Sequence, residues 1–243
     1  MPFSECHITI ATTNAHKLAE LRASFAVLAA EDALLQVASL SPAESMPDVD
    51  ESGADFAENA LLKAKAVPPN QPDGWILAED TGFEVEALAG LYGLNPFPGL
   101  HSNRWLTNAR RAEILDEPLY QELGAQIPVS QPDRNRAILT LMAKHSHRDA
   151  AFVTAMVLWH PASQRLIQAQ AKWPLTVIAS DNLPRGQAGF GYDPICIPKQ
   201  LPGNQPAYAH KTVAELPPAV KHVYSHRAQA LQQVLAQLKA LSV

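Results

Sequence analysis

The chain has 243 residues, of which 47% are hydrophobic, with a net charge of −5 and two cysteines, Cys6 and Cys196. That length suffices for one large domain or two lobes with a sizeable core. The acidic balance argues against broad binding to nucleic acids, and the cysteine spacing argues against a disulfide scaffold or a zinc module. Without a signal-peptide pattern or a long apolar run, we expect a cytoplasmic protein with no membrane partner.

The N-terminal part predicts a strand, a polar loop and a helix, followed by a second helix. Residues 7–11 are β-prone, and apolar residues recur at helical spacing after Lys17. The loop between them offers backbone amides at a helix N-terminus, which is a natural seat for an anion. The second helix is expected from about 54 to 67, before two prolines end it.

The next segment predicts two short strands joined by a turn. Residues 75–78 form an apolar run, and Phe83 and Val85 favour a second strand after a turn at 80–82. Glu79 and Asp80 are therefore expected at the end of a strand.

The rest of the chain predicts helices framed by loops, a hairpin and a closing helix. Helices are expected near 104–123 and 133–145, since prolines and glycines interrupt the sequence around them. A long strand at 151–159 with a partner at 165–171 predicts a hairpin, and the closing helix is expected at 225–241.

Three carboxylates predict a divalent metal site. Glu51, Glu79 and Asp80 supply the oxygen ligands that Mg²⁺ prefers together with water and phosphates. The alternative is that Glu51 is a solvated residue and that the acidic pair belongs only to turn chemistry. An acidic pair between an apolar run and a glycine favours the functional interpretation.

Two lysines, a glycine-rich string and one arginine complete the predicted site. Lys17 and Lys63 are candidates for phosphate contacts, although solvated lysines on helices would look the same. The string Gly189–Pro194 combines backbone freedom with Phe190, whose ring can stack on a base. Arg227 at a helix start is unfavourable unless an anion lies near. The sequence GxxxxGK[ST] is absent, which disfavours a phosphate-loop ATPase.

Taken in order, these motifs resemble those of the inosine triphosphate pyrophosphatase family from residue 8 to residue 238. The family patterns ATGNxGK, ETGxxFxENAxLKA and DDSGLxV are similar to residues 11–17, 51–64 and 79–85. The patterns PGxxSAR, FGYDP and AEL…K…SHRxxAL are similar to residues 98–104, 190–194 and 214–231. Together they are far more specific than any single motif.

The resemblance implies an α/β fold with a long central mixed sheet, helices on both sides, and two lobes around a nucleotide cleft within a single domain, 1–243. It implies a Mg²⁺-dependent homodimer that hydrolyses ITP, dITP and XTP to the monophosphate and pyrophosphate. Asp80, Lys17 and Lys63 are its expected catalytic residues, and Glu51, Asp80 and Glu79 its expected metal ligands. The expected substrate-binding residues are Thr12, Asn14, Lys17, Lys63, Thr81, Phe190, Gly191, Tyr192, Asp193, Lys221, His226 and Arg227.

Several positions depart from the family pattern. Glu79 replaces an Asp, Thr81 a Ser and Thr13 a Gly, and the segments near 91–97 and 108–133 are longer than usual. These changes leave two alternatives open. One is a related pyrophosphatase for other modified nucleotides, and the other is a nucleotide-binding module without catalysis.

Overall fold

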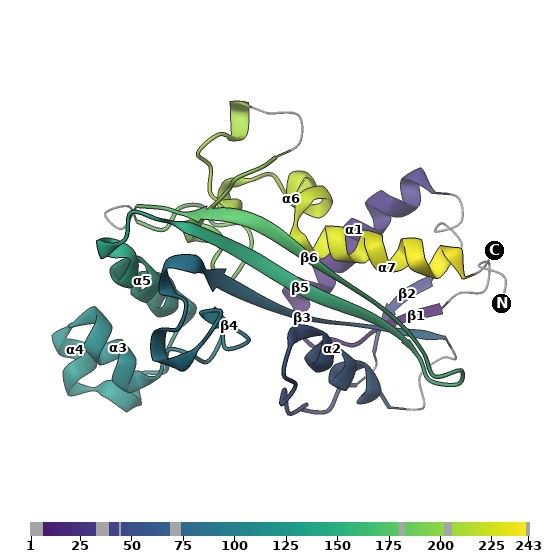
Figure 1. The fold of residues 1–243 in the computed structure, drawn as a ribbon, viewed down its shortest axis with the longest axis horizontal. Coiled ribbons are helices and arrows are strands. Elements are labelled where there is room, and N and C mark those ends of the chain that lie inside the picture. Colours follow the sequence, from purple (N-terminus) through teal and green to yellow (C-terminus); the bar gives the residue numbers. More distant parts are fainter. Residues whose placement is uncertain are drawn as a thin grey trace. The chain divides into compact units, whose positions relative to one another are not determined.

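A computed structural model describes residues 7–32, 39–43, 45–68, 74–179, 183–201 and 206–241 (Figure 1). The chain divides into two compact units, which we describe separately. The first contains Met1–Thr81, Val153–Lys172 and Ala219–Val243. The second contains Gly82–Phe152 and Trp173–Pro218. Within the described residues, no helix is both long enough and apolar enough to cross a bilayer.

The described strands form a mixed sheet in the order β2-β1-β3-β5-β6-β7, with β4 paired to β3. Neighbouring strands are parallel in β1–β2 and β1–β3, and antiparallel in β3–β4 and β6–β7. This confirms the predicted α/β fold with a mixed sheet. The strands are β1 (His7–Ile10), β2 (Ser39–Pro42), β3 (Trp75–Val85), β4 (Pro98–Gly99), β5 (Asp149–His160), β6 (Arg165–Val177) and β7 (Cys196–Pro198).

In the first unit, helices cover both faces of the sheet. Figure 1 shows α1 (Ala15–Glu31) and α7 (His226–Ala240) on one face and α2 (Phe56–Lys65) on the other. Side chains alternate between the faces along each strand, so each face has its own core. One core includes Ile8, Ile10, Leu77, Met156 and Leu158 under α1 and α7, and the other includes Ala60, Ala64, Ile76, Ala78 and Val157 under α2.

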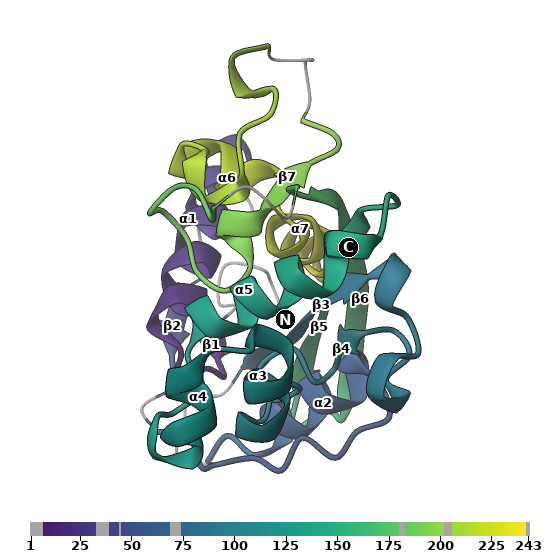
Figure 2. The same cartoon turned by 90° about the vertical axis from the view of Figure 1, so that its left-hand side faces the viewer.

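The second unit contains a helical segment, 108–144, built around a buried arginine. Figure 2 shows α3 (Asn108–Leu115), α4 (Pro118–Glu122) and α5 (Gln131–Leu141) grouped together. The Arg111 guanidinium is fully buried and donates to the carbonyls of Gly124, Ile127 and Pro128. It also pairs with Asp133 at 3.2 Å. The longer segment predicted near 108–133 therefore folds around its own ion pair.

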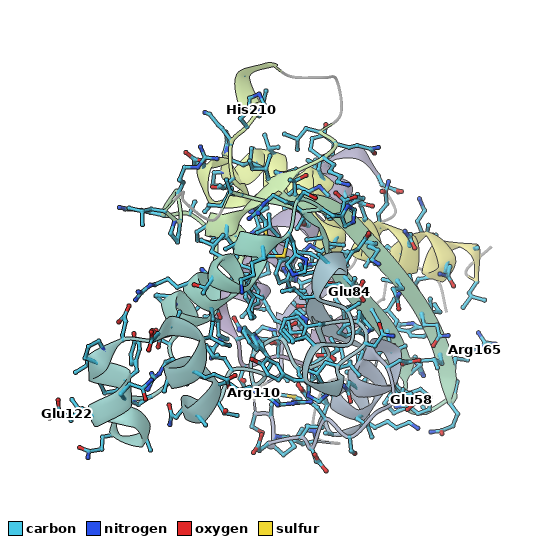
Figure 3. The ribbon with its side chains drawn as sticks, turned by 60° about the vertical axis from the view of Figure 1, so that its left-hand side comes forward. Glu58, Glu84, Arg110, Glu122, Arg165 and His210 are labelled. Atoms are coloured by element: carbon cyan, nitrogen blue, oxygen red, sulfur yellow. The ribbon has the colours of Figure 1, made fainter. Side chains whose placement is uncertain are left out.

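The extra residues near 91–97 are held by a second arginine. The guanidinium of Arg110, labelled on α3 in Figure 3, lies 4.2 Å from the centre of the Tyr92 ring. Phe97 is buried and packs edge-on against Trp105, with ring centres 5.0 Å apart. Both inserted segments thus pack within the second unit.

The predicted turn at 80–82 is wrong, because β3 runs without interruption from Trp75 to Val85. Thr81 Oγ1 lies 2.8 Å from Thr154 Oγ1 on β5, and residues 83 and 84 pair with β4. Thr is well suited to a strand, and these cross-strand contacts outweigh the turn tendency of Asp and Gly. Glu79 and Asp80 accordingly lie inside a strand rather than at its end.

The helix expected near 104–123 is also divided. Asp116 adopts a left-handed conformation at the end of α3, and Pro118 begins α4. Proline at the first turn starts a helix readily, whereas a continuous helix would lose a backbone hydrogen bond there. The hairpin strands and the closing helix match their predictions, and α6 (Pro218–Tyr224) precedes the latter.

Candidate active site

Adjacent residues of β3 send their carboxylates to opposite faces of the sheet in the first unit. Side chains alternate along a strand, so Glu79 shares the face of Leu77 while Asp80 shares the face of Ala78. Glu79 consequently contacts residues of α1 and α7, whereas Asp80 contacts residues of α2. One strand thus contributes to two charged groups, which lie close enough for Lys63 and Asp80 to influence the pKa of Lys17.

The group on the α2 face is rich in carboxylates. Asp55 caps α2 by accepting a hydrogen bond from the Glu58 N–H, which fixes where the helix starts. Asn59 and Lys63 then lie one turn apart on the same side of α2. Lys63 Nζ is 2.7 Å from Asp80 Oδ1 and 2.7 Å from Glu51 Oε1. We call Glu51, Lys63 and Asp80 the carboxylate group.

The group on the α1 and α7 face is rich in cations. Arg227 Nε donates to both carboxylate oxygens of Glu79, at 2.9 and 2.8 Å. Lys17 Nζ lies 3.5 Å from Glu79 Oε1. Glu20 on α1 pairs with Arg227 and Lys221. We call Lys17, Glu20, Glu79, Lys221 and Arg227 the cation group, because three cations share two carboxylates.

Burial and neighbouring charges shift the pKa values in both groups. Burial lowers the pKa of Lys17, and Glu79 only partly offsets this effect. Burial alone would raise the pKa of Glu79, but Arg227 and Lys17 hold it below its ordinary value. Burial alone would lower the pKa of Lys63, yet Asp80 and Glu51 raise it. The charged forms of Glu79 and Lys63 are thus each stabilised by the opposite charges beside them.

His226 lies beside the cation group at the start of α7. Ser225 caps that helix by accepting a hydrogen bond from the Ala228 N–H. Burial, with Arg227 and Lys221 nearby, holds the pKa of His226 well below its ordinary value. The imidazole is therefore neutral near pH 7. Arg227 has the nearby anions that its place at a helix start requires, namely Glu79 and Glu20.

The loop before α1 positions backbone amides at the helix N-terminus. The Asn14 side chain caps α1 by accepting from the N–H groups of His16 and Lys17, at 3.0 and 3.1 Å. Thr12 Oγ1 accepts from the Asn14 N–H at 3.2 Å. These two predicted substrate-binding side chains thus order the loop that leads into Lys17.

Thr81 lies between the cation group and the neighbouring strand. Its hydroxyl oxygen is 3.5 Å from a terminal nitrogen of Arg227 and 2.8 Å from Thr154 Oγ1. The side chain therefore supports Arg227 on the face that it shares with Glu79.

The remaining predicted residues belong to the second unit. Asp193 accepts from the Phe190 N–H at 2.9 Å, and the Gly191 carbonyl accepts from Asn135 at 3.2 Å. Tyr192 is buried and stacks on Phe83, with ring centres 4.5 Å apart. These contacts fix the loop that presents Phe190.

Two residues of the site were missed from the sequence. Glu20 lies one helical turn after Lys17 and pairs with Arg227, which is 207 positions away in sequence. Asn59 was part of a recognised motif but was given no role; it donates to Asp80 at 3.2 Å. The only signal for Glu20 in the sequence was its helical spacing from Lys17. That spacing does not indicate which distant residue Glu20 contacts.

Glu51 and Asp80 carry carboxylate oxygens of the kind that can hold a divalent cation. Their carboxylates converge on one positive charge, the ammonium of Lys63, and both are hard oxygen ligands. Glu79 instead uses both oxygens to bind Arg227. A further group, Glu86, His147 and Asp149, brings ligand atoms within 4.8 Å of one another at the surface of the second unit. There Asp149 pairs with Lys199.

Comparisons with known proteins identify chains that are similar to this one over nearly its whole length. A model of the Ham1 family matches residues 8–237. A dITP/XTP pyrophosphatase of Cutibacterium acnes is 32% identical over 231 residues, covering 94% of each chain. The Ham1 protein of Staphylococcus aureus has a similar structure, with a TM-score of 0.65 and 25% identity over 97% of this chain and 99% of that one. The structure of the Mycobacterium abscessus nucleoside-triphosphatase, a dITP/XTP pyrophosphatase, is also similar, with a TM-score of 0.57. It is 29% identical in sequence, and the match covers 96% of this chain and 98% of that one. These matches confirm the predicted resemblance.

Proposed function

Because the chain belongs to the Ham1 family, we propose that it is a nucleoside triphosphate pyrophosphatase acting on non-canonical purine nucleotides. Its substrates would be ITP, dITP and XTP, and its products the nucleoside monophosphate and pyrophosphate. The relatives that it matches over nearly their whole length bear the name dITP/XTP pyrophosphatase.

The observation that carries this proposal is the contrast between the two faces of β3. The cation group offers Lys17, Lys221 and Arg227 to an anion, whereas the carboxylate group offers Glu51 and Asp80 to a cation. A triphosphate with a divalent metal ion supplies both counter-charges. Such a site acts by alignment and charge stabilisation, which is how phosphoryl transfer is catalysed.

Glu51 and Asp80 would hold Mg²⁺, which when bound neutralises phosphate charge and polarises the bond to be cleaved. Asp80 would also orient the water that attacks the α-phosphorus. Lys17 and Lys63 would stabilise the negative charge of the departing pyrophosphate, with Thr12 and Asn14 ordering the phosphate-binding loop. Glu79, expected from the sequence to assist the metal, is better placed to hold Arg227 and Lys17.

The base would be recognised by an aromatic face and by hydrogen-bond donors. Phe190 would stack on the purine, while Lys221, His226 and Arg227 suit the keto oxygen of hypoxanthine or xanthine. Adenine presents an amino group there, and the mismatch costs about 1–3 kcal/mol when a buried donor loses its acceptor. The proposal includes a cytoplasmic homodimer with no nucleic-acid or membrane partner.

The test is release of pyrophosphate and monophosphate from ITP, dITP and XTP, compared with ATP and GTP, with and without Mg²⁺. Metal-dependent release that favours the deaminated purines would support the proposal, and Asp80→Asn should abolish it without unfolding the protein. Turnover retained by Asp80→Asn would refute the role of that residue. A folded protein that binds ITP tightly but releases no pyrophosphate would instead be a nucleotide-binding module.

A further inference from the structure

Asn59 joins the two segments that carry the carboxylates of the proposed metal site. It lies on α2 and is 0% exposed. Its Oδ1 accepts a hydrogen bond from the Gly53 N–H at 2.8 Å, and its Nδ2 donates to Asp80 Oδ2 at 3.2 Å. One amide side chain thus bridges the loop that follows Glu51 and the strand that carries Asp80.

The chemistry of this bridge requires an amide. A peptide N–H only donates and an ionised carboxylate only accepts, so the side chain between them must offer both an acceptor and a donor. Asparagine satisfies both partners in one orientation. Aspartate would satisfy Gly53 but place a second carboxylate against Asp80, and alanine would leave both partners without the bridge.

Gly53 allows the loop to approach Asn59 closely. A Cβ atom at this position would lie 2.7 Å from Asn59 Oδ1 and 2.8 Å from the Asn59 backbone nitrogen. Such contacts are too short for any side chain, and the backbone nitrogen cannot move independently of α2. The loop and the helix are therefore joined at a fixed separation.

The two oxygens of Asp80 are bound to two side chains of the same helix. Asn59 binds Oδ2 and Lys63 binds Oδ1, while Lys63 also reaches Glu51. The orientation of the Asp80 carboxylate is thus set from α2, and the position of the Glu51 segment is set from the same helix through Gly53. Fixed partners of this kind govern how well carboxylates bind a metal.

We propose that Asn59 is a positioning residue that holds the Glu51 segment and Asp80 at the separation needed to share one divalent cation. This inference rests on the proposed function, since it assumes that both carboxylates bind the metal. It assigns to Asn59 no contact with the nucleotide.

The test is direct binding of Mn²⁺ to the 243-residue chain without nucleotide. Binding is measured by electron paramagnetic resonance, as the loss of the signal of free Mn²⁺. Asn59→Ala should weaken Mn²⁺ binding by about 10-fold to 100-fold, the usual effect of losing a residue that orients a metal ligand. Gly53→Ala should weaken it as well, because it displaces the same bridge while leaving Asn59 in place. Glu51→Gln serves as the variant that lacks a ligand.

Asn135→Ala is the matched control. Asn135 is also a buried asparagine with two side-chain hydrogen bonds, to Gln131 and to the Gly191 carbonyl, but it lies in the second unit. The Asn135→Ala protein should bind Mn²⁺ with an affinity within about twofold of that of the unchanged protein. A general loss of stability would weaken Mn²⁺ binding in both variants and is thereby distinguished from the expected result.

Two outcomes would overturn the inference. One is a folded Asn59→Ala protein and a folded Gly53→Ala protein that both bind Mn²⁺ as the unchanged protein does. The other is an unchanged protein that binds no Mn²⁺ up to millimolar concentration. Failure of the proposed function would look different. The unchanged protein would bind Mn²⁺ and Asn59→Ala would bind it more weakly, but the unchanged protein would hydrolyse no triphosphate.

Discussion

The Nε–H of Arg227 donates to both carboxylate oxygens of Glu79, at 2.9 and 2.8 Å, and the two side chains are 1% and 2% exposed. Removing one partner from a buried ion pair leaves the other charge without compensation, and this costs much more than breaking an exposed pair. Glu79 therefore has a structural task on the face of β3 opposite to Asp80.

Glu79→Gln should lower the free energy of unfolding by about 3 kcal/mol, measured by urea denaturation at pH 7. Mn²⁺ affinity should stay within about twofold, because the Glu79 carboxylate faces Arg227 and Lys17. Glu51→Gln is the comparison, since Glu51 is 31% exposed and should show the reverse pattern of small destabilisation and weak Mn²⁺ binding. If Glu79→Gln loses Mn²⁺ affinity as Glu51→Gln does, Glu79 is a metal ligand, as the sequence predicted.

His226 should make the protein less stable in mild acid. Its pKa is held well below the ordinary value by burial, with Arg227 and Lys221 nearby, so the native state stays neutral while the unfolded state binds a proton. Below the unfolded pKa of about 6.5, this difference removes about 1.4 kcal/mol of stability per pH unit. Between pH 7.5 and 5.5, the free energy of unfolding of His226→Gln should therefore fall by about 1.4 kcal/mol less than that of the unchanged protein.

The measurement is urea denaturation of both proteins at these two pH values. Comparing the change with pH cancels any pH-independent cost of the substitution. It also cancels the acid loss due to Glu79, whose lowered pKa gives stability that is present at neutral pH and is lost as pH falls through its folded value. His145→Gln, at an exposed position, is the control. An identical pH dependence in His226→Gln and the unchanged protein would show that folding does not lower the pKa of His226.

Arg111 should be essential to the helical segment of the second unit. Four acceptors surround its guanidinium: the carbonyls of Gly124, Ile127 and Pro128, and the Asp133 carboxylate. Arg111→Met should cost about 3–5 kcal/mol, because it leaves Asp133 buried without its cation. Hydrogen exchange should quicken first in α3, α4 and α5.

Arg136→Met is the matched control for that substitution. Arg136 pairs with Glu117, but the side chains are 48% and 33% exposed, and an exposed pair contributes about 0–1 kcal/mol. Equal losses of stability in the two variants would mean that the burial of Arg111 does not matter to the fold.

The sequence predicted local structure well where a short segment decides it. The helices predicted after the first loop and at 225–241 are both present, and each begins where a polar side chain, that of Asn14 or Ser225, accepts from the first helical N–H groups. The β-branched and apolar runs of β5 and β6 were likewise sufficient to predict a hairpin. In each case the residues that determine the structure lie within one element or its neighbour.

The parts that were not predicted depend on contacts between distant residues. Whether β3 turns or continues at Thr81 is decided by Thr154 on another strand, and local turn propensity pointed the other way. Because β3 continues, Glu79 and Asp80 face opposite helices, and so a list of three carboxylates divides into two groups of different charge. Glu20 joins one group only because α1 packs against α7.

Tyr192 provides the last prediction, because its environment differs from the substrate contact expected from the sequence. Its hydroxyl accepts from Trp105 Nε1 at 2.9 Å and donates to the Ser102 carbonyl at 2.6 Å, all within buried parts of the second unit. Burial raises the pKa of Tyr192, so the hydroxyl keeps the proton that it donates. Tyr192→Phe should lower stability by about 1–3 kcal/mol, since it leaves the Trp105 N–H and the Ser102 carbonyl without this partner.

In Tyr192→Phe, the KM for ITP should stay within about twofold of that of the unchanged protein. Phe190→Ala is the comparison, because stacking between a base and an aromatic ring contributes about 1–3 kcal/mol and its loss should raise KM by about tenfold or more. If Tyr192→Phe raises KM as much as Phe190→Ala while stability is unchanged, the hydroxyl serves the substrate rather than the core.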